Sequence, residues 1–260
     1  MKAELTGSDW WQHGKDLFLT TSLTESPLAP DYDRSAMITG IVHIGVGGFH
    51  RAHEAVYLDR LMRRRAGAGP RDGAEPIKPG GSCLEWGICG VGLLPGDARM
   101  RDALESQGHL YTLIRKHPGG LRDPVVIGSI HDYRLAPDDP EAVLALMSRP
   151  TTRIVSLTIT EGGYNVDDVT GEFRTFSPGA VHDATHPGEP TTAFGYIVEA
   201  LRRRRADGTP PFTVMSCDNL PGNGKVARTA VVSQAAMSDP ELADWIDGNV
   251  AFPSCMVDRI

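Results

Sequence analysis

Ile41-Val-His-Ile-Gly-Val-Gly-Gly-Phe-His-Arg-Ala-His53 is the stretch of sequence that decides the fold. It overlaps an apolar run, 38–46, which predicts a buried strand, and it continues into a segment, 50–65, which predicts a helix. The glycine cluster between them predicts a tight turn. A strand, a glycine turn and a helix in this order present backbone N–H groups at a helix N-terminus, where a pyrophosphate can bind. The stretch therefore indicates a site for a nicotinamide dinucleotide.

The glycine pattern taken alone leaves two interpretations open. In a dinucleotide site, Gly45 makes the turn, Gly47 lets the pyrophosphate approach, and Gly48 and Phe49 shape the entry to the helix. The third glycine of the usual GxGxxG pattern is absent, because His50 stands at that position. Glycine turns after strands also form for packing reasons alone.

An acidic residue follows the second predicted strand, 84–94. Asp97 lies just beyond Leu94, where a carboxylate can hydrogen-bond the ribose of NAD and would repel the 2′-phosphate of NADP. The alternative is that Asp97 caps the helix that begins at Ala98. The two roles are compatible.

The rest of the chain alternates between strand and helix patterns. Further strands are expected over 111–114, 125–130, 154–160 and 212–217, and helices over 98–107, 138–147, 191–205, 224–237 and 241–249. This alternation predicts an α/β fold with a doubly wound Rossmann-type sheet and flanking helices. We expect 1–37 to be an N-terminal surface segment and 38–260 to be the domain, with loops over 66–82 and 165–190.

Composition excludes several classes of protein. The chain has 260 residues, 40% of them hydrophobic and 23% charged, which is ordinary for a globular protein. A net charge of −7 argues against a nucleic-acid partner, and no apolar run approaches the length of a membrane span. The N-terminus lacks a signal-peptide core, and the four cysteines form no CxxC pair, so a reducing cytoplasm is expected.

Two histidine pairs have spacings at which a helix could hold a metal. His50 and His53 are three residues apart, and His182 and His186 are four apart. No matching carboxylate or thiolate cluster stands near either pair in the sequence, so we predict no metal site.

Two segments place polar groups where predicted strands end. One runs from Thr158 through Glu161 to Tyr164, and the other contains Asp218 and Asn219. Because ligands bind outside the carboxyl ends of the strands in a doubly wound sheet, both segments are expected to face one cleft. Turn chemistry alone is the competing explanation.

These motifs together resemble the polyol-specific long-chain dehydrogenase/reductase family, which includes mannitol 2-dehydrogenase, fructuronate reductase and arabinitol dehydrogenase. The similar segments occur in the family's order over nearly all of the chain after residue 38, and they are 41–53, 88–93, 156–164, 214–221 and 256–260. The resemblance implies zinc-independent, NAD-dependent oxidation of a secondary alcohol of a polyol. For the mannitol branch, the reaction is D-mannitol to D-fructose.

The resemblance also implies roles for particular residues. Asn219 would help to hold the reacting oxygen, Glu161 would lie near the proton exit route, and Asp258 would lie at the polyol site. Asp97 matches an acidic position that favours NAD over NADP. The segment that matches the family's NAD-binding segment comprises Ile44, Gly45, Val46, Gly47, Gly48, Phe49, His50, Arg51 and Ala52.

The chain departs from the family in one major respect. The family's general base is a lysine in a Lys-x4-Asn-x2-His motif, and no such motif occurs here, since Ala230 follows Lys225 at the asparagine position. We therefore expect this chain to correspond to the N-terminal half of the enzyme and to be inactive alone. A smaller departure is Gly96, where some relatives carry a second acid, so cofactor discrimination is expected to be less strict.

Two alternatives remain from the sequence. One is a hexuronate reductase of the same family, and the other is a non-catalytic NAD-binding module. Resemblance to the family implies a monomer for the full-length enzyme, with a small polyol or sugar as its substrate.

Overall fold

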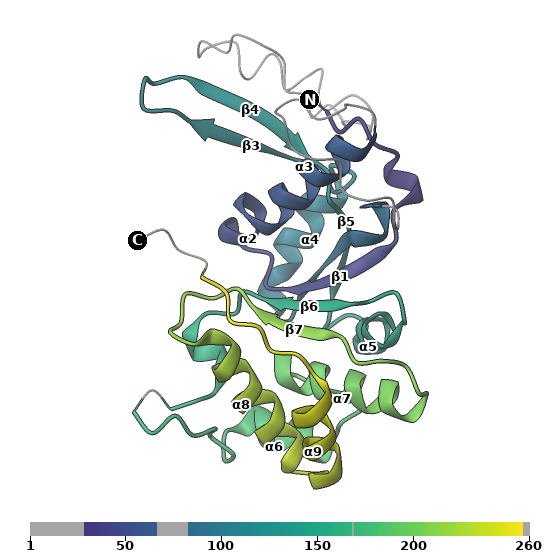
Figure 1. Ribbon diagram of the computed structural model, residues 1–260, viewed down its shortest axis with the longest axis vertical. Coiled ribbons are helices and arrows are strands. Elements are labelled where there is room, and N and C mark those ends of the chain that lie inside the picture. The colour runs from purple at the N-terminus through teal and green to yellow at the C-terminus, as the bar shows by residue number, and fades with distance from the viewer. Residues whose placement is uncertain (1–28, 67–82, 168, 257–260) are drawn as a thin grey trace.

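The computed structural model describes residues 29–66, 83–167 and 169–256, and its centre is a five-stranded parallel sheet (Figure 1). The strand order is β5-β2-β1-β6-β7. The strands are β1 (Thr39–Ile44), β2 (Gly87–Gly92), β5 (Ile130–Leu135), β6 (Ile154–Leu157) and β7 (Thr213–Ser216). A separate antiparallel hairpin pairs β3 (Tyr111–Lys116) with β4 (Arg122–Ile127).

Strand β1 is the middle strand of the sheet, and both of its faces are covered. All six of its residues are buried, and Val42 pairs in parallel register with Cys89 of β2 and Val155 of β6. Val42 and Ile44 belong to the core beneath α5 and α7, whereas Ile41 belongs to the core beneath α3. A continuous apolar run is what a strand buried on both faces requires.

Helices cover the two faces of the sheet (Figure 1). On one face lie α2 (Gly48–Ala52), α3 (Glu54–Ala66) and α4 (Ala98–Glu105). The other face carries α5 (Pro140–Ser148), α6 (Pro178–Thr185), α7 (Ala193–Ala206), α8 (Asn223–Ala236) and α9 (Pro240–Asn249). The predicted doubly wound α/β sheet is therefore confirmed.

The prediction for the fourth strand and the region after it was partly wrong. We expected one strand over 125–130, but β4 ends at Ile127 in the hairpin, and a second strand, β5, begins at Ile130. Strand β5 lies at the edge of the main sheet, so it can contain buried, half-buried and exposed residues together. A search for apolar runs does not find such a mixed strand.

Several other boundaries also differ from the predictions. The predicted helix over 50–65 begins earlier, at Gly48, and breaks at His53, whose backbone is not helical (φ −123°, ψ −90°). The predicted strand over 84–94 starts at Gly87, because residues Cys83–Trp86 form a 3-10 turn. The predicted loop over 165–190 contains α6, which begins with a proline at its first turn and buries Ala180 and Asp183.

The described part of the N-terminal segment is anchored to the domain. Tyr32 and Met37 are buried and pack against Met62 of α3. The predicted loop over 66–82 lies, apart from residue 66, outside the described residues. No helix in the described parts of the chain combines the length and the apolar character that crossing a membrane requires.

Candidate functional site

The candidate site lies at the carboxyl ends of β1 and β6, where the order of the strands reverses. In open α/β sheets this switch point is where ligands bind. Gly45 turns the chain there with φ +92°, and a Cβ on it would lie only 2.1 Å from the carbonyl oxygen of Thr158. Gly45 N–H donates to Val91 O (3.0 Å), and Gly47 N–H donates to Gly45 O (2.7 Å). The turn is tight enough to require glycine at position 45.

A cavity of about 590 Å³ opens on one side of this turn. Its walls include Gly45 and Gly47 from the turn and Asp97 and Arg99 from the start of α4. The Asp97 carboxylate accepts a hydrogen bond from the backbone N–H of Leu94 (2.9 Å). It makes no capping bond to α4, so the predicted side-chain cap is wrong. This hydrogen bond joins the two ends of the short turn that precedes α4.

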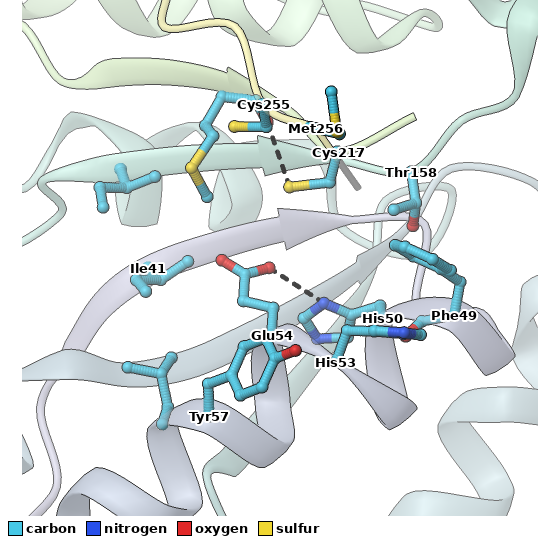
Figure 2. Close-up of a pocket in the computed structure, with 13 residues that line it drawn as sticks. Ile41, Phe49, His50, His53, Glu54, Tyr57, Thr158, Cys217, Cys255 and Met256 are labelled. Carbon is cyan, nitrogen blue, oxygen red and sulfur yellow. Dashed lines mark hydrogen bonds and ion pairs between the residues drawn. The ribbon is translucent and has the colours of Figure 1, made fainter. Parts of the chain in front are cut away.

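A second cavity, of about 380 Å³, lies on the other side of the turn (Figure 2). Phe49 and Glu54 line it from α2 and α3, and Met215 and Cys217 line it from β7 and the residue after it. Thr158 lines both cavities. The glycine turn and Thr158 therefore form the boundary between a cavity that contains Asp97 and a more apolar one.

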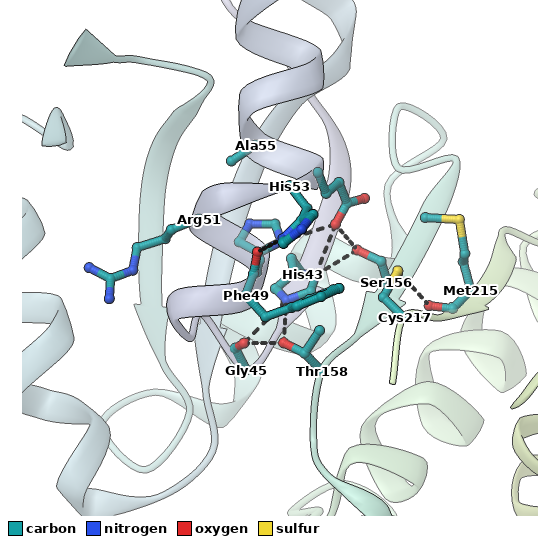
Figure 3. A network of polar contacts seen from close by, with 12 residues as sticks. His43, Gly45, Phe49, Arg51, His53, Ala55, Ser156, Thr158, Met215 and Cys217 are labelled. Carbon is teal, nitrogen blue, oxygen red and sulfur yellow. Dashed lines mark hydrogen bonds and ion pairs between the residues drawn. The ribbon is translucent and has the colours of Figure 1, made fainter. Parts of the chain in front are cut away.

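A buried network of polar side chains packs against the turn (Figure 3). His43 of β1 has Nδ1 2.8 Å from Ser156 Oγ and 3.1 Å from Glu54 Oε2. Its Nε2 lies 2.9 Å from Thr158 Oγ1 and 3.2 Å from Gly45 O. His43 and Ser156 are fully buried, and Glu54 is nearly so, with its side chain 15% exposed. Residues from β1, β6 and α3 thus meet in one cluster.

His50 completes the network. Its ring stacks on that of His43 with centroids 3.5 Å apart, and its Nδ1 lies 3.0 Å from Glu54 Oε2. Burial, followed by the charge of His43, lowers the pKa of His50 to about 4. Burial by itself would raise the pKa of Glu54, but the contacts with His43 and His50 outweigh it and lower that pKa well below its ordinary value. Glu54 is therefore an ionised carboxylate held by imidazoles.

The same three residues have the composition of a metal site. The ligand atoms of His43, His50 and Glu54 lie within 4.8 Å of one another. However, an imidazole binds a metal in its ring plane at about 2 Å. Two nearly parallel rings with centroids 3.5 Å apart cannot both do so toward one ion. The geometry suits a hydrogen-bonded network instead. The proximity of Glu54 corrects the expectation that no carboxylate stands near His50.

Neither predicted histidine pair converges on one point. His53 stacks on Phe49 and its Nδ1 lies 2.8 Å from Phe49 O, whereas His50 points into the network. His182 and His186 stack on each other, with Nδ1 atoms near Asp183 and Thr185 respectively.

A second carboxylate ties together the loops after β6 and β7. Asp218 accepts hydrogen bonds from the backbone N–H groups of Ile159 and Thr160 (both 3.0 Å). It also accepts one from the hydroxyl of Tyr164 (2.7 Å). Residue Thr160 precedes Glu161, and Asp218 precedes Asn219, so the two predicted site segments are brought together. Asn219 and Glu161 are both exposed at this edge of the sheet.

The predicted cofactor-binding segment is divided between the two cavities. Four of its residues line the cavity that contains Asp97, namely Gly45, Val46, Gly47 and Arg51. Two line the smaller cavity, namely Phe49 and His50. The side chain of Ile44 is buried in the core, and Gly48 and Ala52 are exposed without lining either cavity. Asp258 lies outside the described residues.

Sequence reasoning missed the roles of His43 and Glu54, and it named Thr158 only as the first residue of a polar segment. A signal was present, because Glu54 follows His50 by four residues, a spacing that places both on one helical face. His43 and Ser156 are polar residues inside apolar strand patterns. Nothing in the sequence shows that those two positions are neighbours.

Comparison with known proteins gives one consistent result. The sequence model described as the mannitol dehydrogenase Rossmann domain matches residues 39–260. A mannitol 2-dehydrogenase from Cereibacter sphaeroides is 50% identical over 238 residues, which are 92% of this chain and 46% of that protein. A polyol:NADP oxidoreductase from Gluconobacter oxydans is 46% identical over 241 residues, again 92% of this chain and 46% of that protein.

A solved structure agrees with this match. The ternary complex of Pseudomonas fluorescens mannitol 2-dehydrogenase with NAD and D-mannitol superposes with a TM-score of 0.80 at 48% identity. It covers 89% of this chain, whereas this chain covers 44% of it. The chain thus spans about half the length of the curated relatives it matches.

Proposed function

Because the chain belongs to the mannitol dehydrogenase family, we propose that it is the NAD-binding part of an NAD-dependent polyol dehydrogenase. The proposed reaction is oxidation of a secondary alcohol, with D-mannitol to D-fructose as the specific case. The observation that carries the proposal is the cavity that contains both the Gly45–Gly47 turn and Asp97. The 48% identity to a dehydrogenase solved with NAD and D-mannitol supports it.

The residues around this cavity fit a dinucleotide. A side chain at Gly45 would fill the space against Thr158, whereas at Gly47 the nearest atom to an added Cβ is 3.9 Å away. The space beside the Cα of Gly47 is therefore open to a ligand. The guanidinium groups of Arg51 and Arg99, which line the cavity, would balance the negative charge of a diphosphate.

Asp97 would receive the ribose. Its carboxylate is held by the Leu94 N–H, so one oxygen is positioned and the group remains an acceptor for hydroxyl hydrogens. A 2′-phosphate at the same place would meet a like charge. This arrangement favours NAD over NADP.

The reacting end would lie at the loops joined by Asp218. NAD supplies the hydride acceptor when it is bound. Asn219, placed beside Asp218, would donate a hydrogen bond to the oxygen of the alcohol and stabilise the negative charge that develops there. Glu161, exposed on the neighbouring loop, would pass the released proton to water. Asp258 would contact the polyol.

The test is cofactor binding by calorimetry. Wild-type chain should bind NAD saturably and more tightly than NADP. Asp97→Ala should weaken NAD binding by about tenfold, as expected for loss of a charged hydrogen-bond acceptor, and should affect NADP much less. Asp102→Ala is the matched control, because Asp102 is an exposed acid of α4, the helix that follows Asp97, and it pairs with Arg101.

Two results would overturn the proposal. The first is a wild-type chain that binds neither dinucleotide. The second is an equal loss for NAD and NADP in Asp97→Ala, which would remove the ribose role.

A further inference from the structure

Three polar groups converge on the carbonyl oxygen of Gly45, and two of them, from Thr158 and His43, are drawn in Figure 3. Gly47 N–H donates to it at 2.7 Å, the Thr158 hydroxyl donates to it, and His43 Nε2 lies 3.2 Å away. A carbonyl has two lone pairs, so this oxygen is held more firmly than an ordinary turn requires. The peptide that joins Gly45 to Val46 is consequently fixed in orientation.

The protons of the network can be placed from its contacts. Thr158 uses its hydroxyl hydrogen on Gly45 O, so its oxygen faces His43 Nε2 as an acceptor. Both neighbours of Nε2 are then acceptors, and Nε2 must carry a hydrogen. On the other side of the ring, the Ser156 hydroxyl donates to Glu54 (3.0 Å). His43 Nδ1 also faces that carboxylate, so it too must carry a hydrogen.

The negative charge of Glu54 therefore determines the state of the cluster. An imidazole that donates from both nitrogens is cationic, and it is stable in a buried position only next to an anion. Glu54 provides that anion through the oxygen that also contacts His50. From Glu54 through His43 to Thr158, one chain of contacts runs from α3 to the turn.

We propose that Glu54 and Thr158 are positioning residues, which act through His43 to hold the Gly45 carbonyl in the shape that accepts the cofactor. The inference rests on the proposed function. It is supported by the place of Thr158, which borders both cavities, so that the held carbonyl lies where the two halves of a dinucleotide would meet. Without the Glu54 carboxylate, the His43 ring loses the contact that orients it from α3, and the turn loosens.

The experiment combines three variants with a binding measurement. Thr158→Val keeps the shape of the side chain and removes the hydroxyl, whereas Thr158→Ser keeps the hydroxyl. Thr158→Val should weaken NAD affinity at least tenfold, and Thr158→Ser should restore it to within about threefold of wild type. Glu54→Gln should weaken affinity by a similar factor. The control is Thr185→Val, which removes a hydroxyl bonded to a backbone carbonyl of α6 and should leave affinity unchanged.

The double variant separates a shared pathway from two independent contacts. If Glu54 and Thr158 act through one chain of hydrogen bonds, the pair should lose little more affinity than the worse single variant. If the affinity loss of the double variant equals the product of the two single losses, the inference is wrong. That result would mean that Thr158 contacts the cofactor independently of Glu54. Thermal midpoints of all variants are measured in parallel.

Two further outcomes have clear meanings. If Thr158→Val and Glu54→Gln lower the thermal midpoint but bind NAD as wild type does, the network is only structural and the inference is wrong. If the wild-type chain does not bind NAD, the proposed function fails first. Imidazole N–H resonances of His43, seen by NMR in wild type and lost in Glu54→Gln, would support the network without reference to the cofactor.

Discussion

Two carboxylates support the two sides of the candidate site in different ways. Glu54 lies next to the glycine turn that follows β1. Its carboxylate contacts two imidazole nitrogens and accepts a hydrogen bond from a serine hydroxyl. Asp218 lies between the loops after β6 and β7, and two of its three donors are backbone N–H groups. One side of the site is therefore held by side chains, and the other mainly by backbone groups.

The difference shows which side of the site is more sensitive to mutation and to acid. Backbone N–H groups are donors whatever the side chain, except at proline, so the Asp218 arrangement depends mainly on one carboxylate. The Glu54 arrangement depends on the protons of two histidines and on two hydroxyl groups. We expect the turn side to respond to mutation and to acid more strongly than the loop side.

The largest effect should come from Gly45→Ala. The new Cβ would lie 2.1 Å from Thr158 O, and φ +92° is strained for alanine. We expect a loss of about 3 kcal/mol or more in the free energy of unfolding, measured by urea denaturation, and loss of NAD binding. Gly47→Ala is the control, because its nearest neighbour is 3.9 Å away, and it should lose less than about 1 kcal/mol. Equal losses of stability in both variants would show that Gly45 is not packed closely against Thr158, the residue that follows β6.

A smaller effect should appear as a pH dependence of stability. His50 has its pKa lowered from 6.5 to about 4, so the unfolded chain binds its proton at a higher pH than the folded chain does. Stability that is present above pH 6.5 is therefore lost as the pH falls toward 4. Between pH 7.5 and 5 the loss from His50 should be about 2 kcal/mol by urea denaturation.

His50→Gln tests that assignment. The pKa values of His109 and His131 are also lowered by burial, so wild type should retain some slope from them. The variant should show a shallower decline with acid than wild type over the same pH range. An unchanged slope would place the acid sensitivity elsewhere.

The smallest effect on the cofactor should come from Asp218→Asn. The variant keeps one acceptor oxygen and loses the charge, so we expect a loss of about 1–2 kcal/mol in the free energy of unfolding. Affinity for NAD should change less than twofold, because the glycine turn is untouched. Asp247→Asn, which affects an exposed pair with Arg228, is the control for charge removal. A loss of NAD affinity as large as that of Glu54→Gln would contradict the division of the site into two separately held sides.

Local patterns were enough to predict several parts of the molecule. The apolar run before Gly45 predicted the central strand, since a strand covered on both faces must be apolar throughout. The position of Asp97 just after the second strand placed it at the ligand edge, and the structure puts it in the cavity with Gly45. Its contact was not predictable, because a capping residue and a residue that closes a loop have the same sequence signal.

Edge elements and short helices were harder to predict. Strand β5 has accessible residues among its buried ones, as an edge position permits, so it does not stand out as an apolar run. Helix α6 has eight residues, and much of its burial comes from Asp183, which accepts hydrogen bonds from Thr191 and Thr192. No periodicity rule anticipates a helix held by a buried carboxylate.

The sequence by itself determined the fold class, the glycine turn and the polar ends of the strands, because these depend on neighbours a few residues apart. Only the tertiary structure decided what holds the turn. Ser156 meets Glu54 across 102 residues of chain, and Asp218 meets Ile159 across 59. Parallel strands bring such distant residues together, and the burial that follows makes their hydrogen bonds necessary.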